Sequence, residues 1–127
     1  MTLPQYRALV LIWTRPRTTL SDLATSLDVH PTSATRLVDR LVRKKLVRRA
    51  ESPTDRRQTE LHLAAAGRRL VERVTDRRRA ELARITSRMR AAEVAEVTSA
   101  LSAFAAAADP DAESSAELLG WGAPPAR

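Results

Sequence analysis

Hydroxyl and guanidinium side chains recur at helical spacing in the first third of the chain. They lie opposite an apolar stripe that begins at Ala34, and they are Thr32, Ser33, Thr35, Arg36 and Arg40. A guanidinium group can donate two hydrogen bonds to O6 and N7 of guanine, and hydroxyl groups bind phosphate oxygens. The pattern therefore indicates contact with double-stranded DNA, with Arg36 as the candidate for a base and Arg40 for a phosphate. Thr32 and Ser33 open the helix, where free backbone amides would assist phosphate binding.

A second basic site follows in a segment with the pattern of a hairpin. Leu46–Arg49 is consistent with a short strand, and Thr59–Leu63 alternates polar and apolar residues as a half-buried strand does. A turn-forming stretch that ends at Asp55 joins them. Arg56 and Arg57 would lie at the tip, where they could reach the minor groove, whose negative potential attracts arginine. Asp55 either pairs with Arg57 and directs it or caps the turn.

Three helices must position these groups. Thr2 and Thr19 are predicted N-caps of the first two. Pro31 suits the first position of the third, which we expect to end at about Arg43 or Lys44. Two short helices joined by a tight turn, the second of them basic on its outer face, form a helix-turn-helix. The fold class predicted is mainly α with a small β-hairpin wing, that is, a winged helix-turn-helix plus long C-terminal dimerisation helices.

The second half of the chain returns to helical periodicity. One helix is expected from Ala64 to Arg90, and a final one from about Ala92 to Ala107. Their apolar faces exceed what one small domain needs, which predicts a homodimer. The residues expected in its interface are Leu70, Val74, Leu82, Ile85, Met89, Val94, Val97, Leu101 and Phe104. We thus expect a DNA-binding part over 1–63, a helical dimerisation segment over 64–108 and a mobile tail over 109–127.

The charge of the chain supports a polyanionic partner. The net charge is +7, and nine basic residues face three acidic ones between His30 and Arg57, so most of the excess lies on the two candidate sites. No apolar run is long enough to span a bilayer, and no signal peptide is visible. We expect no membrane partner and a cytoplasmic location.

The residues needed for other kinds of site are missing or scattered. The chain has no cysteine, which excludes disulfides and thiolate zinc sites. Its two histidines, His30 and His62, belong to different predicted elements, so we expect no metal site. No nucleophile elbow and no glycine-rich phosphate loop occurs. We therefore expect neither an enzyme nor a bound cofactor.

From Leu3 to about Met89 the chain resembles the MarR family of regulators. The segment 20–41 is similar to the helix-turn-helix of that family. The segment 55–57, Asp-Arg-Arg, is similar to its D-x-R wing signature, and Gly67 follows at a matching position. The D-x-R motif is quite specific when it comes directly after a helix-turn-helix.

The resemblance implies a homodimer that binds a pseudo-palindromic operator, usually as a repressor. It also implies release from DNA when a small anionic or phenolic ligand binds between the dimerisation helices and the DNA-binding part. Trp13 is the candidate for lining that pocket, although a large apolar residue at helical spacing more often belongs to the core. Two alternatives stay open: a DNA-binding protein without ligand sensing, architectural or constitutive, and a basic helical module that binds other proteins.

The chain departs from the family pattern at a few places. Asp28 and Lys45 stand where the family often has glycine, and a side chain in a left-handed conformation is costly there. His30 takes the N-cap place and is expected to cap less well than Ser or Asp. The family also has a helix before the one that begins near Leu3. Either the start is truncated or the dimer forms mainly through the last two helices.

Overall fold

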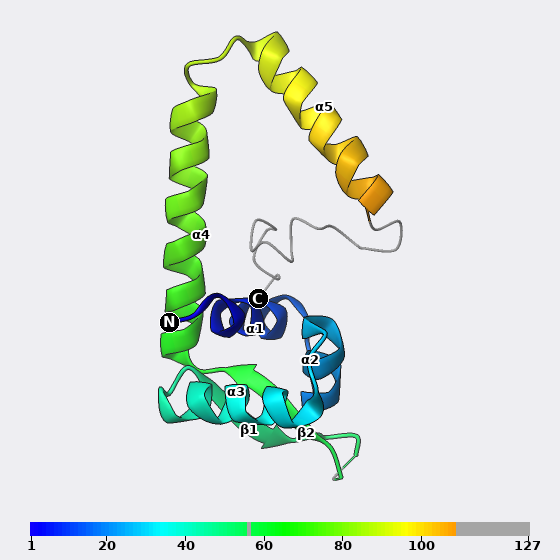
Figure 1. Cartoon of the computed structure of the whole chain (residues 1–127). Coiled ribbons are helices and arrows are strands. Elements are labelled where there is room, and N and C mark those ends of the chain that lie inside the picture. The colour runs from blue at the N-terminus through cyan, green and yellow to red at the C-terminus, as the bar shows by residue number, and fades with distance from the viewer. Residues whose placement is uncertain (56, 109–127) are drawn as a thin grey trace.

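The computed structural model describes residues 1–55 and 57–108, in which five helices accompany one two-stranded antiparallel sheet (Figure 1). Arg56 and the predicted tail 109–127 lie outside the described residues. The elements are α1 (Leu3–Thr14), α2 (Leu20–Leu27), α3 (Pro31–Arg43), β1 (Val47–Glu51), β2 (Thr59–Leu63), α4 (Ala65–Thr86) and α5 (Ala91–Ala108). This order confirms the mainly helical fold with a hairpin wing.

The first two helices begin at capping boxes, as predicted. Thr2 caps α1 together with Gln5, whose Oε1 accepts from the Thr2 amide at 3.4 Å. Thr19 caps α2, and Asp22 accepts from the Thr19 hydroxyl at 2.7 Å and from its amide at 2.9 Å. These bonds hold the pKa of the Asp22 carboxyl below its usual range, because they stabilise the charged form.

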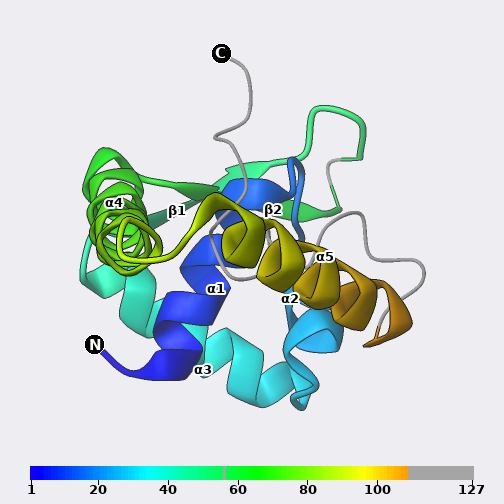
Figure 2. The ribbon, with the colours of Figure 1, turned by 90° about the horizontal axis from the view of Figure 1, so that it is seen from above.

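The core surrounds α1, which is buried on several sides. Leu9 and Val10 are at most 1% exposed, because α2, β2 and α4 all pack against this helix. Each of the other elements of the DNA-binding part contributes at least one fully buried side chain, among them Leu23, Val38 and Leu61. Figure 2 shows α1 between α4 on one side and α2 on the other. The core therefore fixes α2 and the sheet against α1, and α3 against α2 and β1.

The hairpin is tied to the start of α2. β1 pairs with β2 in a register that sets Val47 against Leu63. Thr19 forms an isolated bridge with Glu60, and the Leu61 amide donates to the Thr18 carbonyl at 2.8 Å. The wing is thus held by backbone bonds to the helix-turn-helix as well as by side-chain packing. The predicted first strand was placed one residue early and ended two residues too soon.

The long predicted helix over 64–90 ends earlier than expected. α4 stops at Thr86, and a turn separates it from α5. The Arg88 and Met89 amides donate to carbonyls three residues back, so the i to i−4 ladder is broken there. Glu93 accepts from the Arg90 amide at 2.9 Å and starts the next helix. Figure 1 shows α4 rising away from the DNA-binding part and α5 descending beside it, without extensive contact to another described element.

Candidate nucleic-acid interface

The outer face of α3 carries the polar groups predicted from the sequence. Ala34, Val38 and Leu41 are fully buried, which turns the opposite face to solvent. The exposed predicted residues on this helix are Thr32, Ser33, Arg36 and Arg40. Thr35 is half-buried, and its hydroxyl donates to the Pro31 carbonyl at 2.9 Å. Of the predicted groups, the helix therefore presents two guanidinium groups and two hydroxyl groups on one side.

The start of α3 differs from the prediction in one respect. His30 is the N-cap, and its Nδ1 accepts from the Thr32 amide at 3.3 Å. The Ser33 amide donates to the His30 carbonyl at 2.8 Å. The expectation of free amides at Thr32 and Ser33 is therefore wrong, because His30 takes up both donors. The two exposed hydroxyl groups are what remains for phosphate.

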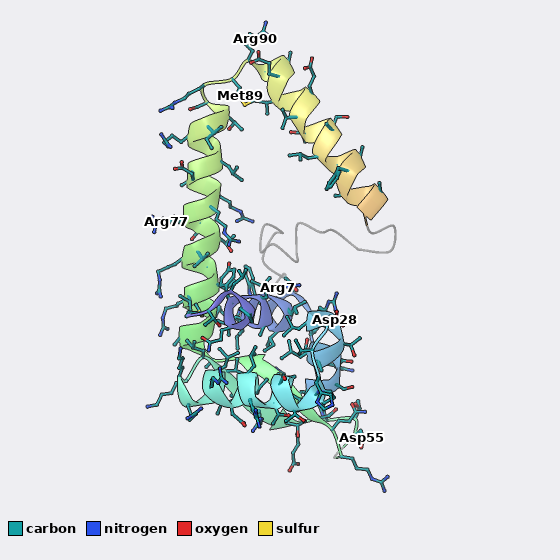
Figure 3. All side chains as sticks on the ribbon, viewed as in Figure 1. Arg7, Asp28, Asp55, Arg77, Met89 and Arg90 are labelled. Atoms are coloured by element: carbon teal, nitrogen blue, oxygen red, sulfur yellow. The ribbon has the colours of Figure 1, made fainter. Side chains whose placement is uncertain are left out.

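The wing carries its tip at the same lower end of the molecule as α3, while seen from above the two lie on opposite sides of α1 (Figure 2). Figure 3 shows Asp55 at the end of the hairpin, at the same end of the molecule as α3. Asp55 Oδ1 accepts from the Arg57 backbone amide at 2.9 Å, and the Asp55 carbonyl accepts from the Gln58 amide at 2.9 Å. Of the two roles considered for Asp55, the contact observed is the turn cap. Arg57 is exposed, and Arg56 lies outside the described residues.

Two features of this surface were missed from the sequence. Arg43 is exposed and lies seven residues after Arg36, which places it on the same face of α3. That spacing could have identified it. Asp39 of α3 forms an ion pair with Arg49 of β1 at 2.8 Å. No pattern in the sequence predicts this pair, because it depends on how the strand lies against the helix.

The residues predicted for dimerisation divide into two groups. Leu70 and Val74 are half-buried and pack against the core of the DNA-binding part. Met89 and Val94, on either side of the turn between α4 and α5, are also half-buried. The remaining five are exposed by 42 to 74%, and they are Leu82, Ile85, Val97, Leu101 and Phe104. The bare apolar surface therefore lies on the far half of α4 and along α5.

A groove lies along α4 on the side of the half-buried pair. Its volume is about 720 Å³, and it is lined by Leu70, Arg73, Val74, Arg77, Arg78 and Glu81. The Arg78 guanidinium carbon stands 5.1 Å from the centre of the Tyr6 ring of α1. Trp13 is buried in the core and does not line this groove. The groove combines two apolar side chains with three arginines and one glutamate.

The described parts of the chain contain neither a metal-binding cluster nor a membrane-spanning helix. No three histidine, cysteine or acidic side chains gather there as a metal site would require. No helix in those parts is both long and apolar enough to cross a membrane.

Comparison with known proteins supports the same fold. A model of the MarR family matches residues 1–59. The chain is 40% identical over 73 residues to YhbI of Bacillus subtilis, an HTH-type transcriptional regulator, a match that covers 58% of this chain and 47% of YhbI. It spans about half the length of the curated relatives it matches.

Solved structures match over more of the chain. The crystal structure of RV1404 from Mycobacterium tuberculosis is similar with a TM-score of 0.77 and 42% identity, over 89% of this chain and 78% of that one. Streptococcus pneumoniae FabT, solved in complex with DNA, is similar with a TM-score of 0.69 and 28% identity, over 82% and 73%. The similarity extends through the helices after the wing.

Proposed function

Because the chain belongs to the MarR family, we propose that it is a DNA-binding transcriptional regulator. The observation that carries this proposal is the outer face of α3, where Arg36 and Arg40 are exposed opposite a fully buried stripe. An α-helix fits the major groove of B-DNA, and Arg36 is our candidate for a guanine contact. Arg40 and the hydroxyl groups of Thr32 and Ser33 are candidates for phosphate contacts.

The wing supplies the second contact in this proposal. Arg57 is exposed beside a turn that Asp55 caps, so its backbone position is fixed while its side chain remains accessible. An arginine held beside a helix in the major groove can enter the adjacent minor groove. The FabT complex supports DNA as the partner, since that protein of similar fold was solved with DNA.

The test is fluorescence anisotropy with DNA from upstream of the chain's own gene and with scrambled DNA, at two salt concentrations. Arg36→Ala is expected to weaken the preference for upstream DNA by roughly five- to a hundredfold, the effect of losing one bidentate base contact. Arg7→Ala is the matched control, because Arg7 is an exposed arginine on α1 (Figure 3). Equal binding of the unaltered protein to both DNAs, lost in higher salt, would contradict sequence-specific regulation and favour an architectural role.

The same proposal includes a homodimer formed by α4 and α5. Five apolar side chains are exposed on these helices, with Phe104 at 74% and Leu101 at 60%. Val97, Leu101 and Phe104 follow one another at spacings of four and three, which is the seam of a helix that packs on another helix. We propose that a second copy of the chain covers this apolar face. A pseudo-palindromic operator needs such a dimer, because two recognition helices must be held in register.

Light scattering after gel filtration tests the dimer. We expect a mass near 28 kDa, twice the 14.1 kDa of the chain, and a monomer for Leu101→Glu, because a buried charge without a partner opposes association. Ser99→Glu, at an exposed position on the opposite face of α5, controls for the added charge. A Leu101→Glu protein that remains a dimer would contradict this interface.

Finally, we propose that the protein is a repressor released by a small anionic aromatic ligand in the groove along α4. Leu70 and Val74 would contact an apolar ring, while Arg73 and Arg77 would bind a carboxylate. Arg78 links the groove to α1 through the Tyr6 ring. Benzoate added to the protein–DNA complex should lower the anisotropy, and Arg77→Ala should raise the concentration needed. DNA binding unaffected by such carboxylates would favour the alternative without ligand sensing.

A further inference from the structure

We propose that the ion pair between Asp39 and Arg49 is a positioning pair that fixes the wing relative to α3, so that discrimination between DNA sequences depends on it. The inference rests on the proposed DNA-binding function and adds two residues to it. Neither residue needs to contact DNA. Instead, the pair would fix the angle between α3 and the wing, the two elements proposed to enter adjacent grooves of the DNA.

The strand register explains why Arg49 reaches α3. Residues that pair directly across an antiparallel ladder lie on the same face of the sheet, and residues two apart in a strand share that face. Val47 and Arg49 therefore lie on one face together with their partners, Leu63 and Leu61. Val47 and Leu61 are each 2% exposed, so this is the face that packs on the core. Arg49 thus lies on the core-packing face of β1, where its side chain stays 40% exposed and reaches Asp39 of α3.

Asp39 is the matching charge on the helix. It is the single acidic residue of α3, and one of its carboxylate oxygens stands 2.8 Å from a guanidinium nitrogen of Arg49. It lies one turn from Arg36 and directly before Arg40, on a helix proposed to approach phosphates. An unpaired carboxylate there would repel DNA. Its pairing with Arg49 offsets that repulsion and ties the helix to the strand.

Within residues 1–55 and 57–108, no other side-chain hydrogen bond or ion pair joins α3 to the hairpin. The remaining contacts between α3 and the strand are a backbone bond from the Leu46 amide to the Leu41 carbonyl, directly before β1, and apolar packing in the common core. Apolar packing is non-directional, whereas a charge-assisted hydrogen bond at 2.8 Å constrains orientation. Among the side-chain contacts of the described residues, the pair is therefore the directional link between the two proposed reading elements.

Because both side chains are exposed, a positioning role for the pair can be distinguished from a role in stability. The two side chains are 40% and 47% exposed, and pairs as exposed as this contribute little to the folding free energy. If the pair served stability alone, removing it would lower the thermal midpoint or have no measurable effect. A positioning pair should change the ratio of specific to non-specific DNA affinity while the thermal midpoint stays almost unchanged.

Asp39→Asn gives the sharpest test, because a pure charge effect and a positioning effect predict different changes in DNA binding. By charge alone, removing a carboxylate beside the DNA surface should strengthen binding to every DNA. If the pair positions the wing, the ratio of upstream to scrambled affinity should fall about three- to fivefold, the factor that corresponds to an exposed ion pair. Arg49→Gln should lower the ratio similarly. Arg48→Gln, on the opposite face of β1, is the matched control and should leave the ratio unchanged.

The charge-swapped protein, Asp39→Arg with Arg49→Asp, completes the test. It keeps the net charge and should restore most of the ratio lost in the single variants. The inference is overturned if Asp39→Asn keeps the original ratio, if the swap restores nothing, or if loss of the ratio follows a fall in the thermal midpoint to the assay temperature. A failure of the proposed function is distinguishable from all of these, since the unaltered protein would then show no preference for upstream DNA.

Discussion

Gly67→Ala offers a sharp test of how the helical segment is docked on the DNA-binding part. A Cβ atom at this position would lie 2.1 Å from the Leu46 carbonyl oxygen and 3.0 Å from its carbon. Real contacts of this kind are not shorter than 3 Å, so the backbone must shift. The Leu46 oxygen cannot move freely, because it accepts the Ala64 amide at 2.9 Å just before α4 begins.

The magnitude follows from two opposing effects. In an exposed helix, Ala in place of Gly would stabilise by about 1 kcal/mol. Here the overlap should cost about 1–3 kcal/mol, as other overpacked sites do, and straining the bond between Ala64 and Leu46 adds about 0.5–1.5 kcal/mol. We expect a net loss of about 0.5–3.5 kcal/mol. At about 4–8 °C for each kcal/mol, the thermal midpoint should fall by roughly 2–28 °C.

Thermal unfolding followed by circular dichroism measures this difference. Arg68→Ala is the control, since Arg68 is exposed on the same turn and its replacement should change the midpoint little. A Gly67→Ala protein as stable as the original, or more stable, would refute the close packing of α4 on the turn after α3. It would then follow that helix propensity outweighs the contact.

Four other outcomes can be measured on further variants by urea or thermal unfolding. Leu41→Ala removes a fully buried side chain of α3 and should cost about 2–5 kcal/mol. Thr19→Ala should cost about 0.5–2 kcal/mol through the lost cap of α2. Since the pKa of Asp22 is lowered in the folded state, its stabilisation is full above about pH 4 and is lost as the pH falls further, so Asp22→Asn should flatten the acid side of the stability profile. Glu81→Gln, although it breaks an ion pair with Arg84, should leave the midpoint unchanged because both groups are exposed.

The helices of the DNA-binding part were predictable because their ends are encoded locally. Thr2, Thr19 and Pro31 are signals that act within one turn, and each marks the start of a helix as predicted. The buried stripe of α3 followed from spacing in the same way. The end of α4 was not predictable, because the helical pattern continues through Ser87 to Arg90 and only the bonds of the turn reveal the break.

The candidate site was predictable to the extent that it depends on a single helix. Arg36 and Arg40 lie on the predicted face, because the apolar stripe alone determines which side of α3 is exposed. The hydrogen bond from the Thr32 amide to His30 was not predicted, because histidine is not among the residues preferred at the N-cap. Contacts between elements, such as that of Asp39 with Arg49, need the strand register as well, and the predicted strand was one residue off at its start.

The turn over 44–46 shows why local rules and tertiary contacts must be combined. Lys45 has φ of 56°, as expected for a position where a glycine would be easier. The conformation persists because the Leu46 amide donates to Leu41 and the Leu46 carbonyl accepts from Ala64, so one residue closes α3 and receives the start of α4. Gly67 allows α4 to approach that same carbonyl. The orientation of the proposed DNA-reading helix relative to the proposed dimerisation helix is therefore set at Leu46, by backbone bonds that no side-chain pattern specifies.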